Sequence, residues 1–232
     1  MSQPTGPRDL IAATRAAFAD KKSGNMTIHI IINNAGVAGN RFVTASIDSE
    51  HADSDMVADF EKQYRTNVLG PLLLLQAALP YLPTDRSGRI VNLSSVSSSL
   101  GFPGQSVYGG TKAALEAMTR TWARELSERC TVNAVNPGPV ATDMYKGVDK
   151  EFAGMMLHWN SVTPGAQVRE GRGGDSEEVV RMVKEGNEGR GLGGRAATVE
   201  EVAGVVSMLC SAESGWCTGS VICANGGMRF SM

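Results

Sequence analysis

The sequence contains few of the residues that build metal and redox sites. Its three histidines are spread over positions 29 to 158, and its cysteines form no Cys-x-x-Cys pair. The cysteines are Cys130, Cys210, Cys217 and Cys223. Local metal or dithiol motifs need such residues at close spacing. We therefore expect no metal site, and we expect thiols that act as small apolar or surface groups.

Long apolar runs and runs of one charge are also absent. The longest apolar stretch, residues 68–79, is shorter than the roughly 20 residues that span a bilayer, and it contains Gly70, Pro71 and Gln76. The first twenty residues have no signal-peptide apolar block. A net charge of −2 without a basic run offers a polyanion no attraction. These absences predict a cytoplasmic protein that binds neither nucleic acid nor a membrane.

The 232 residues suit a single α/β domain, residues 1–232, with one core. Short runs rich in β-branched residues alternate with helical patterns along the chain. The runs cover residues 28–32, 89–93, 131–135 and 220–223, and the helical patterns cover 9–19, 60–82, 108–128 and 199–210. Such alternation indicates parallel strands joined by crossover helices. The predicted fold is a Rossmann-like parallel sheet with helices on both faces.

The expected helices carry individual signals. The first has Leu10, Thr14, Ala17 and Phe18 on one side, which we expect to be its apolar face. Residues 72–75 are apolar all round, which predicts burial against the sheet and against another helix or subunit. The last helix starts at a capping box, Thr198-x-x-Glu201, with Val202, Val206 and Leu209 on its buried side.

A glycine-rich segment covers residues 165–195, which hold nine of the 27 glycines. We interpret it as a flexible insertion, with a substrate-gating loop and an ordinary surface loop as the alternatives. Residues 189–194 (GRGLGG) fit the pattern GxGxxG, but a charged helical patch at 176–185 precedes them instead of a strand. A phosphate-binding loop must follow a strand and open a helix. We therefore interpret this match as chance.

The pair Tyr108 and Lys112 carries the chemistry. Spaced four residues apart near the start of a helix, the two side chains share one helical face. A tyrosine with a pKa near 10 is a poor base at neutral pH, and moving that pKa to about 7 requires roughly 4 kcal/mol. One lysine charge about 4 Å away, at an effective dielectric near 20, supplies about that much. An exposed helical pair without function is the alternative.

Ser95 strengthens the functional interpretation. It lies just beyond the strand expected at 89–93, and the carboxyl ends of strands are where open α/β sheets bind ligands. A hydroxyl there can hold a carbonyl oxygen while Tyr108 gives that oxygen a proton, as carbonyl reduction by hydride requires. The neighbouring serines leave a plain polar turn as the alternative.

Several motifs in chain order extend this pattern. They are Asn33-Asn34-Ala35-Gly36 after the first strand, Asn67 in a helix, Ser95, Tyr108 with Lys112, residues 136–142 (NPGPVAT), and Asn225-Gly226-Gly227. In this order the chain resembles the short-chain dehydrogenase/reductase family over residues 9–229, and it is similar to oxoacyl-carrier-protein reductases.

The resemblance implies a role for each matching residue. Tyr108 would be the general acid/base and Ser95 would orient the substrate oxygen. Lys112 would lower the pKa of Tyr108 and contact the nicotinamide ribose, and Asn67 would complete the catalytic tetrad through a water. The cofactor, NADP or NAD, would be bound by Asn34, Gly36, Tyr108, Lys112, Val140 and Thr142. The substrate would be a small carbonyl or alcohol, and the protein a homo-oligomer, dimer or tetramer, paired through the helices at 60–82 and 108–128.

Asn67 also has an interpretation from the residues alone. Pro71 lies four positions later and has no N–H, so it cannot bond the Asn67 carbonyl. The freed carbonyl could hold a water directed toward Lys112, or the break could simply fit residues 72–75 to the core.

Members of this family normally begin with a strand, a TGxxxGxG turn and a helix, and no such turn precedes the first helix of these 232 residues. The sequence therefore suggests an N-terminally truncated Rossmann fold, with the strand at 28–32 at or near an edge. That turn normally grips the pyrophosphate, so we expect weak dinucleotide binding by this chain.

Three functions follow from these residues. The first is an oxidoreductase that interconverts carbonyls and secondary alcohols by hydride transfer with NAD(P)(H). The second is a cofactor-independent acid/base enzyme, an isomerase or dehydratase, on the same scaffold. The third is a catalytically silent partner protein. The complete set of catalytic residue types favours the first.

Overall fold

The computed structural model describes residues 3, 5–46, 52–146, 150–171, 175–177, 180–181 and 194–230. The chain divides into two compact units. The first consists of Met1–Ala134 and Met208–Val221, and the second of Val135–Ser207 and Ile222–Met232. The single domain expected from the sequence stays a prediction.

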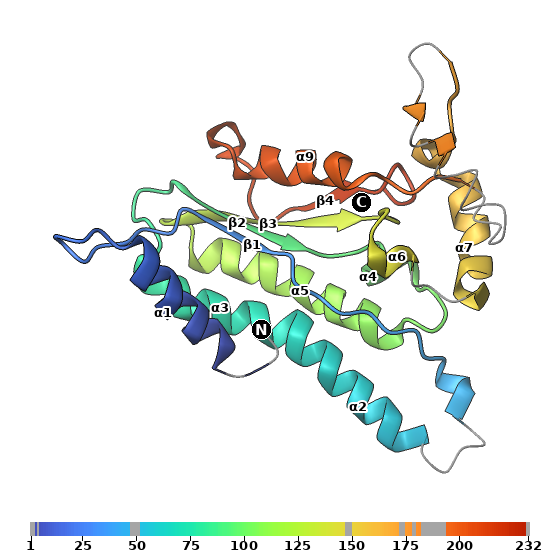
Figure 1. Cartoon of the computed structure of the whole chain (residues 1–232), viewed down its shortest axis with the longest axis horizontal. Helices are drawn as coiled ribbons and strands as arrows, with labels where there is room; N and C mark the ends of the chain where they lie inside the picture. Colours follow the sequence, from blue (N-terminus) through green and yellow to red (C-terminus); the bar gives the residue numbers. More distant parts are fainter. Residues whose placement is uncertain are drawn as a thin grey trace. The chain divides into compact units, whose positions relative to one another are not determined.

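The sheet that the structure describes has four strands in the order β1-β2-β3-β4 (Figure 1). The strands are β1 (Ile30–Asn33), β2 (Gly88–Leu93), β3 (Cys130–Pro137) and β4 (Val221–Ala224). β1 and β2 pair in parallel, with Ile30 opposite Arg89 and Asn33 opposite Asn92. Each strand begins within two residues of the run that predicted it, which confirms the predicted parallel sheet.

Helices connect the strands in the alternating order that the sequence predicts. The described helices are α1 (Gly6–Phe18), α2 (Ala52–Tyr64), α3 (Gly70–Ala78), α4 (Ser97–Leu100), α5 (Ser106–Glu125), α6 (Asp143–Lys146), α7 (Lys150–Val162) and α9 (Val199–Cys210). A π-helical turn, η2 (Arg65–Leu69), joins α2 to α3. Short 3₁₀ turns cover η1 (Val43–Ser46), η3 (Leu79–Tyr81), η4 (Pro164–Ala166) and η5 (Ala212–Ser214).

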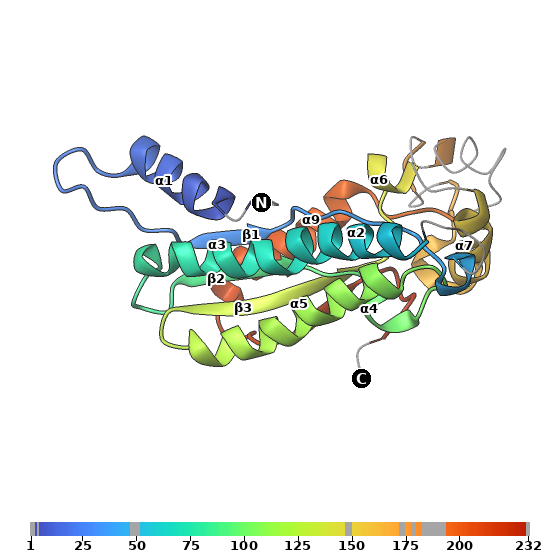
Figure 2. The same cartoon turned by 90° about the horizontal axis from the view of Figure 1, so that it is seen from below.

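The core of the first unit lies between strands β1 to β3 and the helices α3 and α5, which run side by side along the sheet (Figure 2). It buries one face of each element, because helical side chains repeat every 3.6 residues and strand side chains every two. The central side chains are Ile31, Ile90 and Val132 from the strands, Leu74 and Leu75 from α3, and Leu115 and Trp122 from α5.

The predicted apolar face of the first helix is wrong. Leu10 and Phe18 are 48% and 78% exposed, whereas Pro7 and Ile11 are buried. α1 packs on α3, and a helix that packs against one other helix buries only a narrow stripe. The helix also begins at Gly6, three residues earlier than predicted, because Pro7 suits a first turn.

The predicted capping box of α9 is confirmed. The Glu201 N–H donates to Thr198 Oγ1 over 3.3 Å, and the Thr198 N–H donates to Glu201 Oε2 over 2.8 Å. Both bonds satisfy N–H groups that have no partner inside the helix. Val202 and Leu209 are buried as expected, and Val206 is half-buried.

The single helix predicted over residues 60–82 is interrupted. At η2 the Gly70 N–H donates to the carbonyl of Arg65, five residues back, so one extra residue is accommodated in this turn. Pro71 follows directly and cannot donate to the Asn67 carbonyl. The break expected at Pro71 is therefore present, and it leaves Thr66 and Asn67 buried.

The contact between α4 and α5 depends on a glycine. A Cβ added at Gly109 would lie 2.5 Å from the carbonyl oxygen of Ser97, and backbone cannot yield as a flexible side chain can. We predict that Gly109→Ala lowers the free energy of unfolding by about 1–3 kcal/mol in urea titrations. Gly204→Ala on α9 is the control, because a Cβ there meets nothing within 4 Å. It should raise stability by about 0.5–1 kcal/mol, and equal effects of the two changes would refute the close contact.

Candidate active site

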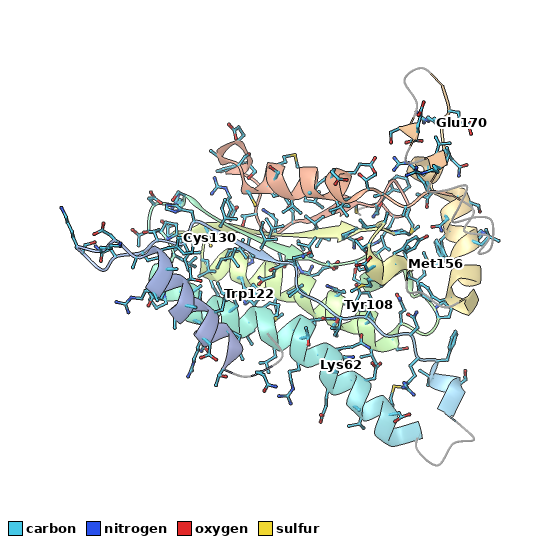
Figure 3. The ribbon with its side chains drawn as sticks, in the orientation of Figure 1. Lys62, Tyr108, Trp122, Cys130, Met156 and Glu170 are labelled. Atoms are coloured by element: carbon cyan, nitrogen blue, oxygen red, sulfur yellow. The ribbon has the colours of Figure 1, made fainter. Side chains whose placement is uncertain are left out.

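The candidate site lies in the first unit, where β1 and β2 end. Because the two strands are parallel, the segments that follow them leave the same edge of the sheet. Asn34 and Gly36 follow β1, and Ser94 and Ser95 follow β2. The first turns of α5 add Tyr108, which is labelled in Figure 3, and Lys112, which follows one turn later. The structure thus brings together the residues predicted from sequence on β2 and α5.

The Ser95 hydroxyl lies close enough to Tyr108 to interact with it, and this interaction lowers the pKa of Tyr108. Ser95 is itself held by its neighbours, because the Ser97 N–H donates to Ser95 Oγ over 3.2 Å and the two serine hydroxyls lie 3.1 Å apart. Burial raises the pKa of Tyr108 above its ordinary value of 10, and the interaction with Ser95 opposes this rise. Tyr108 is therefore a protonated phenol at neutral pH, able to donate to an oxygen beside Ser95.

Lys112 is buried beside the Tyr108 ring. Its ammonium donates to the carbonyl of Leu93 over 2.7 Å and lies 5.6 Å from the centroid of the Tyr108 ring. Burial lowers the pKa of Lys112 to about 8, because the charged form loses its hydration. The expectation that Lys112 brings the pKa of Tyr108 to about 7 is not met in this structure, since burial of the phenol outweighs the other influences on it.

Asn67 clamps the segment after β1 to α5. Its Nδ2 donates to the Val37 carbonyl over 2.8 Å and to Thr111 Oγ1 over 3.0 Å, while its Oδ1 accepts the Val37 N–H over 2.9 Å. Only 1% of Asn67 is exposed. A Cβ added at Gly36 would lie 3.4 Å from Asn67 Oδ1 and 3.5 Å from Lys112 Nζ, so the chain passes close to both. The contact of Asn67 with a water stays a prediction.

Val140 and Thr142, the other predicted cofactor residues, belong to the second unit. Val140 forms an isolated parallel bridge with Ala197, and Thr142 is exposed with its hydroxyl donating to the Val140 carbonyl over 3.3 Å. The structure does not place them relative to Tyr108. The pattern GxGxxG at 189–194 lies outside the described residues apart from Gly194.

Three residues of the site were missed in the sequence. Thr111, Glu116 and Thr119 lie on the buried face of α5 with Lys112, and each is hydrogen-bonded to another buried side chain. Helical spacing could have pointed to Glu116 and Thr119, because positions 112, 116 and 119 share one face of a helix. Polar residues at such positions are ordinarily expected to face solvent.

The site fits the nicotinamide half of a dinucleotide. A buried ammonium and a phenol near a serine offer donors to a ribose, and Gly36 adds no side chain of its own beside Lys112. Among the described residues, no group of three or more His, Cys, Asp or Glu could hold a metal ion. No described helix has the length and hydropathy needed to cross a membrane.

Comparisons with known proteins agree with this chemistry. Residues 11–184 match the family model described as Enoyl-(Acyl carrier protein) reductase. The chain is 51% identical to an L-xylulose reductase of Aspergillus niger, covering 95% of this chain and 74% of the relative. It is also 51% identical to an L-xylo-3-hexulose reductase of Hypocrea jecorina, covering 88% and 67%. A short-chain dehydrogenase/reductase structure from Brucella melitensis aligns with a TM-score of 0.72 and 25% identity, covering 99% and 74%.

The fold and these relatives define an oxidoreductase that interconverts carbonyls and secondary alcohols with NAD(P)(H). The chain belongs to the short-chain dehydrogenase/reductase family. The predicted enzyme class is thereby confirmed.

The buried charge of Lys112 should be visible in the pH dependence of stability. Because the folded pKa is about 8 and the unfolded one 10.5, the unfolded chain binds more protons between these values, so the free energy of unfolding rises with pH there. Lys112→Met removes this titration. We predict that the parent gains up to about 3 kcal/mol in free energy of unfolding, relative to the variant, as the pH rises from 8 to 10.5. Lys62→Met, at an exposed lysine of α2, is the control, and a difference independent of pH would contradict the burial.

Proposed function

We propose that this chain reduces a ketose, a polyhydroxy ketone of the xylulose or hexulose type, to the corresponding alcohol with NAD(P)H. The observation that carries the proposal is the grouping of Ser95, Tyr108 and Lys112 at the carboxyl end of β2. The substrate class is supported by two relatives at 51% identity whose names are L-xylulose reductase and L-xylo-3-hexulose reductase.

In this proposal the ketone oxygen lies between two hydroxyl groups. Ser95 donates a hydrogen bond to the oxygen, and Tyr108 transfers its proton to it as the carbonyl carbon is reduced. The raised pKa of Tyr108 keeps the phenol protonated at neutral pH, which favours reduction. The charge of Lys112, over the Tyr108 ring, stabilises the phenolate that remains.

NAD(P)H supplies the hydride when it is bound. Lys112 would contact its nicotinamide ribose, and Asn34, Gly36 and Tyr108 would line the cofactor beside it. Asn67 supports this half indirectly, because it holds Val37 and Thr111 in fixed positions.

We also propose a homo-oligomer, a dimer or tetramer, that pairs through α2 and α3. Three apolar side chains of α2, α3 and the η2 turn between them are 38–47% exposed, namely Phe60, Leu69 and Leu72. Leu74 and Leu75 are buried in the core, whereas Leu72, in the same apolar segment, is exposed and can contact a second subunit.

The oligomer is tested by placing a charge on this face. Leu72→Glu should shift the protein to a smaller species in sedimentation velocity at micromolar concentration, because a buried unpaired carboxylate is costly. Leu10→Glu is the matched control, since Leu10 is a similarly exposed leucine on α1. A parent that sediments as a monomer, or a Leu72→Glu variant identical to the parent, would refute the pairing.

The catalytic role of Tyr108 is tested by removing its hydroxyl. Tyr108→Phe should lower kcat for ketose reduction at least 10³-fold at millimolar NAD(P)H, because proton transfer is lost while the ring still fills its place. Far-ultraviolet circular dichroism and the urea midpoint check the fold.

Tyr81→Phe is the matched control for this change. Tyr81 lies in η3, where its carbonyl accepts the Ile28 N–H before β1 begins, away from the edge that carries Ser95. Its loss should leave kcat unchanged. A Tyr108→Phe variant that reduces ketoses at the parent rate would overturn the proposed mechanism.

A further inference from the structure

A buried carboxylate lies behind the proposed catalytic groups. Glu116 is only 8% exposed on α5, one turn after Lys112. Its Oε1 accepts two hydroxyl hydrogen bonds, from Ser94 Oγ over 2.6 Å and from Ser98 Oγ over 2.7 Å. Bonds from hydroxyl groups to a carboxylate are short and strong in this way when the acceptor is charged.

The two donors lie on either side of Ser95 in the chain. Ser94 is the residue before it, and Ser98 belongs to α4, three residues after it. The carboxylate of Glu116 therefore grips the segment 94–98 at both ends, and Ser95 lies between the two attachments. Ser94 Oγ also lies 3.4 Å from the Lys112 carbonyl, which brings the same segment against the turn that carries Lys112.

This attachment differs from simple packing. The contact of Gly109 with the Ser97 carbonyl fixes how closely α4 approaches α5, but it has no directional bond to Ser95. Hydrogen bonds to Glu116 fix where the segment lies along α5, because they run to one oxygen atom. The position of Ser95 relative to Tyr108, on the same helix as Glu116, depends on that register.

We propose that Glu116 is a positioning residue for the reduction: it holds the segment 94–98 so that the Ser95 hydroxyl faces Tyr108. The inference rests on the proposed function, which gives Ser95 and Tyr108 their roles. Glu116 contacts neither substrate nor cofactor in this account and acts through Ser94 and Ser98.

The first test replaces the carboxylate with an amide of the same size. Glu116→Gln should lower kcat for ketose reduction about tenfold, because the charge-assisted bonds weaken. The KM for NAD(P)H should stay unchanged. The interaction with Ser95 opposes the rise in the pKa of Tyr108, so a looser Ser95 should move the pH–rate profile of alcohol oxidation toward higher pH. A merely structural role would not move that profile.

The second test removes the donors instead of the acceptor. The double variant Ser94→Ala, Ser98→Ala should reproduce the loss in kcat and the shift in the pH–rate profile, and adding Glu116→Gln should cause little further change. If Glu116→Gln fails to fold, the double serine variant tests the positioning role by itself. Glu125→Gln, at an exposed glutamate of the same helix, is the matched control and should behave as the parent.

The outcomes separate this inference from the proposed function. Parental kcat and pH profile in Glu116→Gln would overturn the inference, and so would a variant that is less stable but otherwise parental. The variant Ser95→Ala tests whether Ser95 itself is needed for the reduction. If Ser95→Ala loses activity while Glu116→Gln does not, only the positioning role is refuted; if Ser95→Ala keeps parental activity, the proposed role of Ser95 fails and the inference fails with it.

Discussion

The site depends on the way α5 is fastened to the end of β2 by buried hydrogen bonds. Consecutive residues of β2 and its extension bond to one face of the helix, a set of contacts that we call the α5–β2 seam. The seam joins Asn92 to Thr119 over 2.8 Å, Leu93 to Lys112 over 2.7 Å, and Ser94 to Glu116 over 2.6 Å. Positions 112, 116 and 119 share a face because a helix turns every 3.6 residues, so a straight strand end can engage all three.

The seam extends to the other segments of the site. Asn33 Nδ2 donates to Asn92 Oδ1 over 2.7 Å, which ties the end of β1 to the seam. On α5, Thr111 Oγ1 accepts a hydrogen bond from Asn67 Nδ2, and the same Nδ2 also donates to the Val37 carbonyl. Polar groups buried in this way are costly to leave unpaired, so the network has few alternative arrangements. The network is shielded from water, because Asn67, Asn92, Thr111 and Thr119 are each at most 1% exposed. Tyr108 and Ser95 are therefore presented by rigid neighbours, as proton transfer to a substrate oxygen requires.

Local periodicity explains what could be predicted from the sequence. The strands followed from β-branched runs, Tyr108 and Lys112 from their i, i+4 spacing, α9 from its capping box, and the break before α3 from Pro71. Long-range packing decided the rest. The exposure of Leu10 and Phe18 depends on which element α1 packs against. A glutamate such as Glu116 is expected at the surface from sequence, and only the fold brings Ser94 and Ser98 beside it. The raised pKa of Tyr108 likewise reflects burial, which spacing does not reveal.

The account is tested most directly by following hydrogen from the cofactor into the product. The protein would be incubated with a ketose and with NAD(P)H carrying two deuterium atoms at C4 of the nicotinamide, and the alcohol would be examined by mass spectrometry and NMR. The account predicts one deuterium on the carbon that was the carbonyl, with the hydroxyl proton drawn from solvent through Tyr108. Conversion of the ketose without deuterium on that carbon would contradict it and would indicate acid/base chemistry in place of hydride transfer.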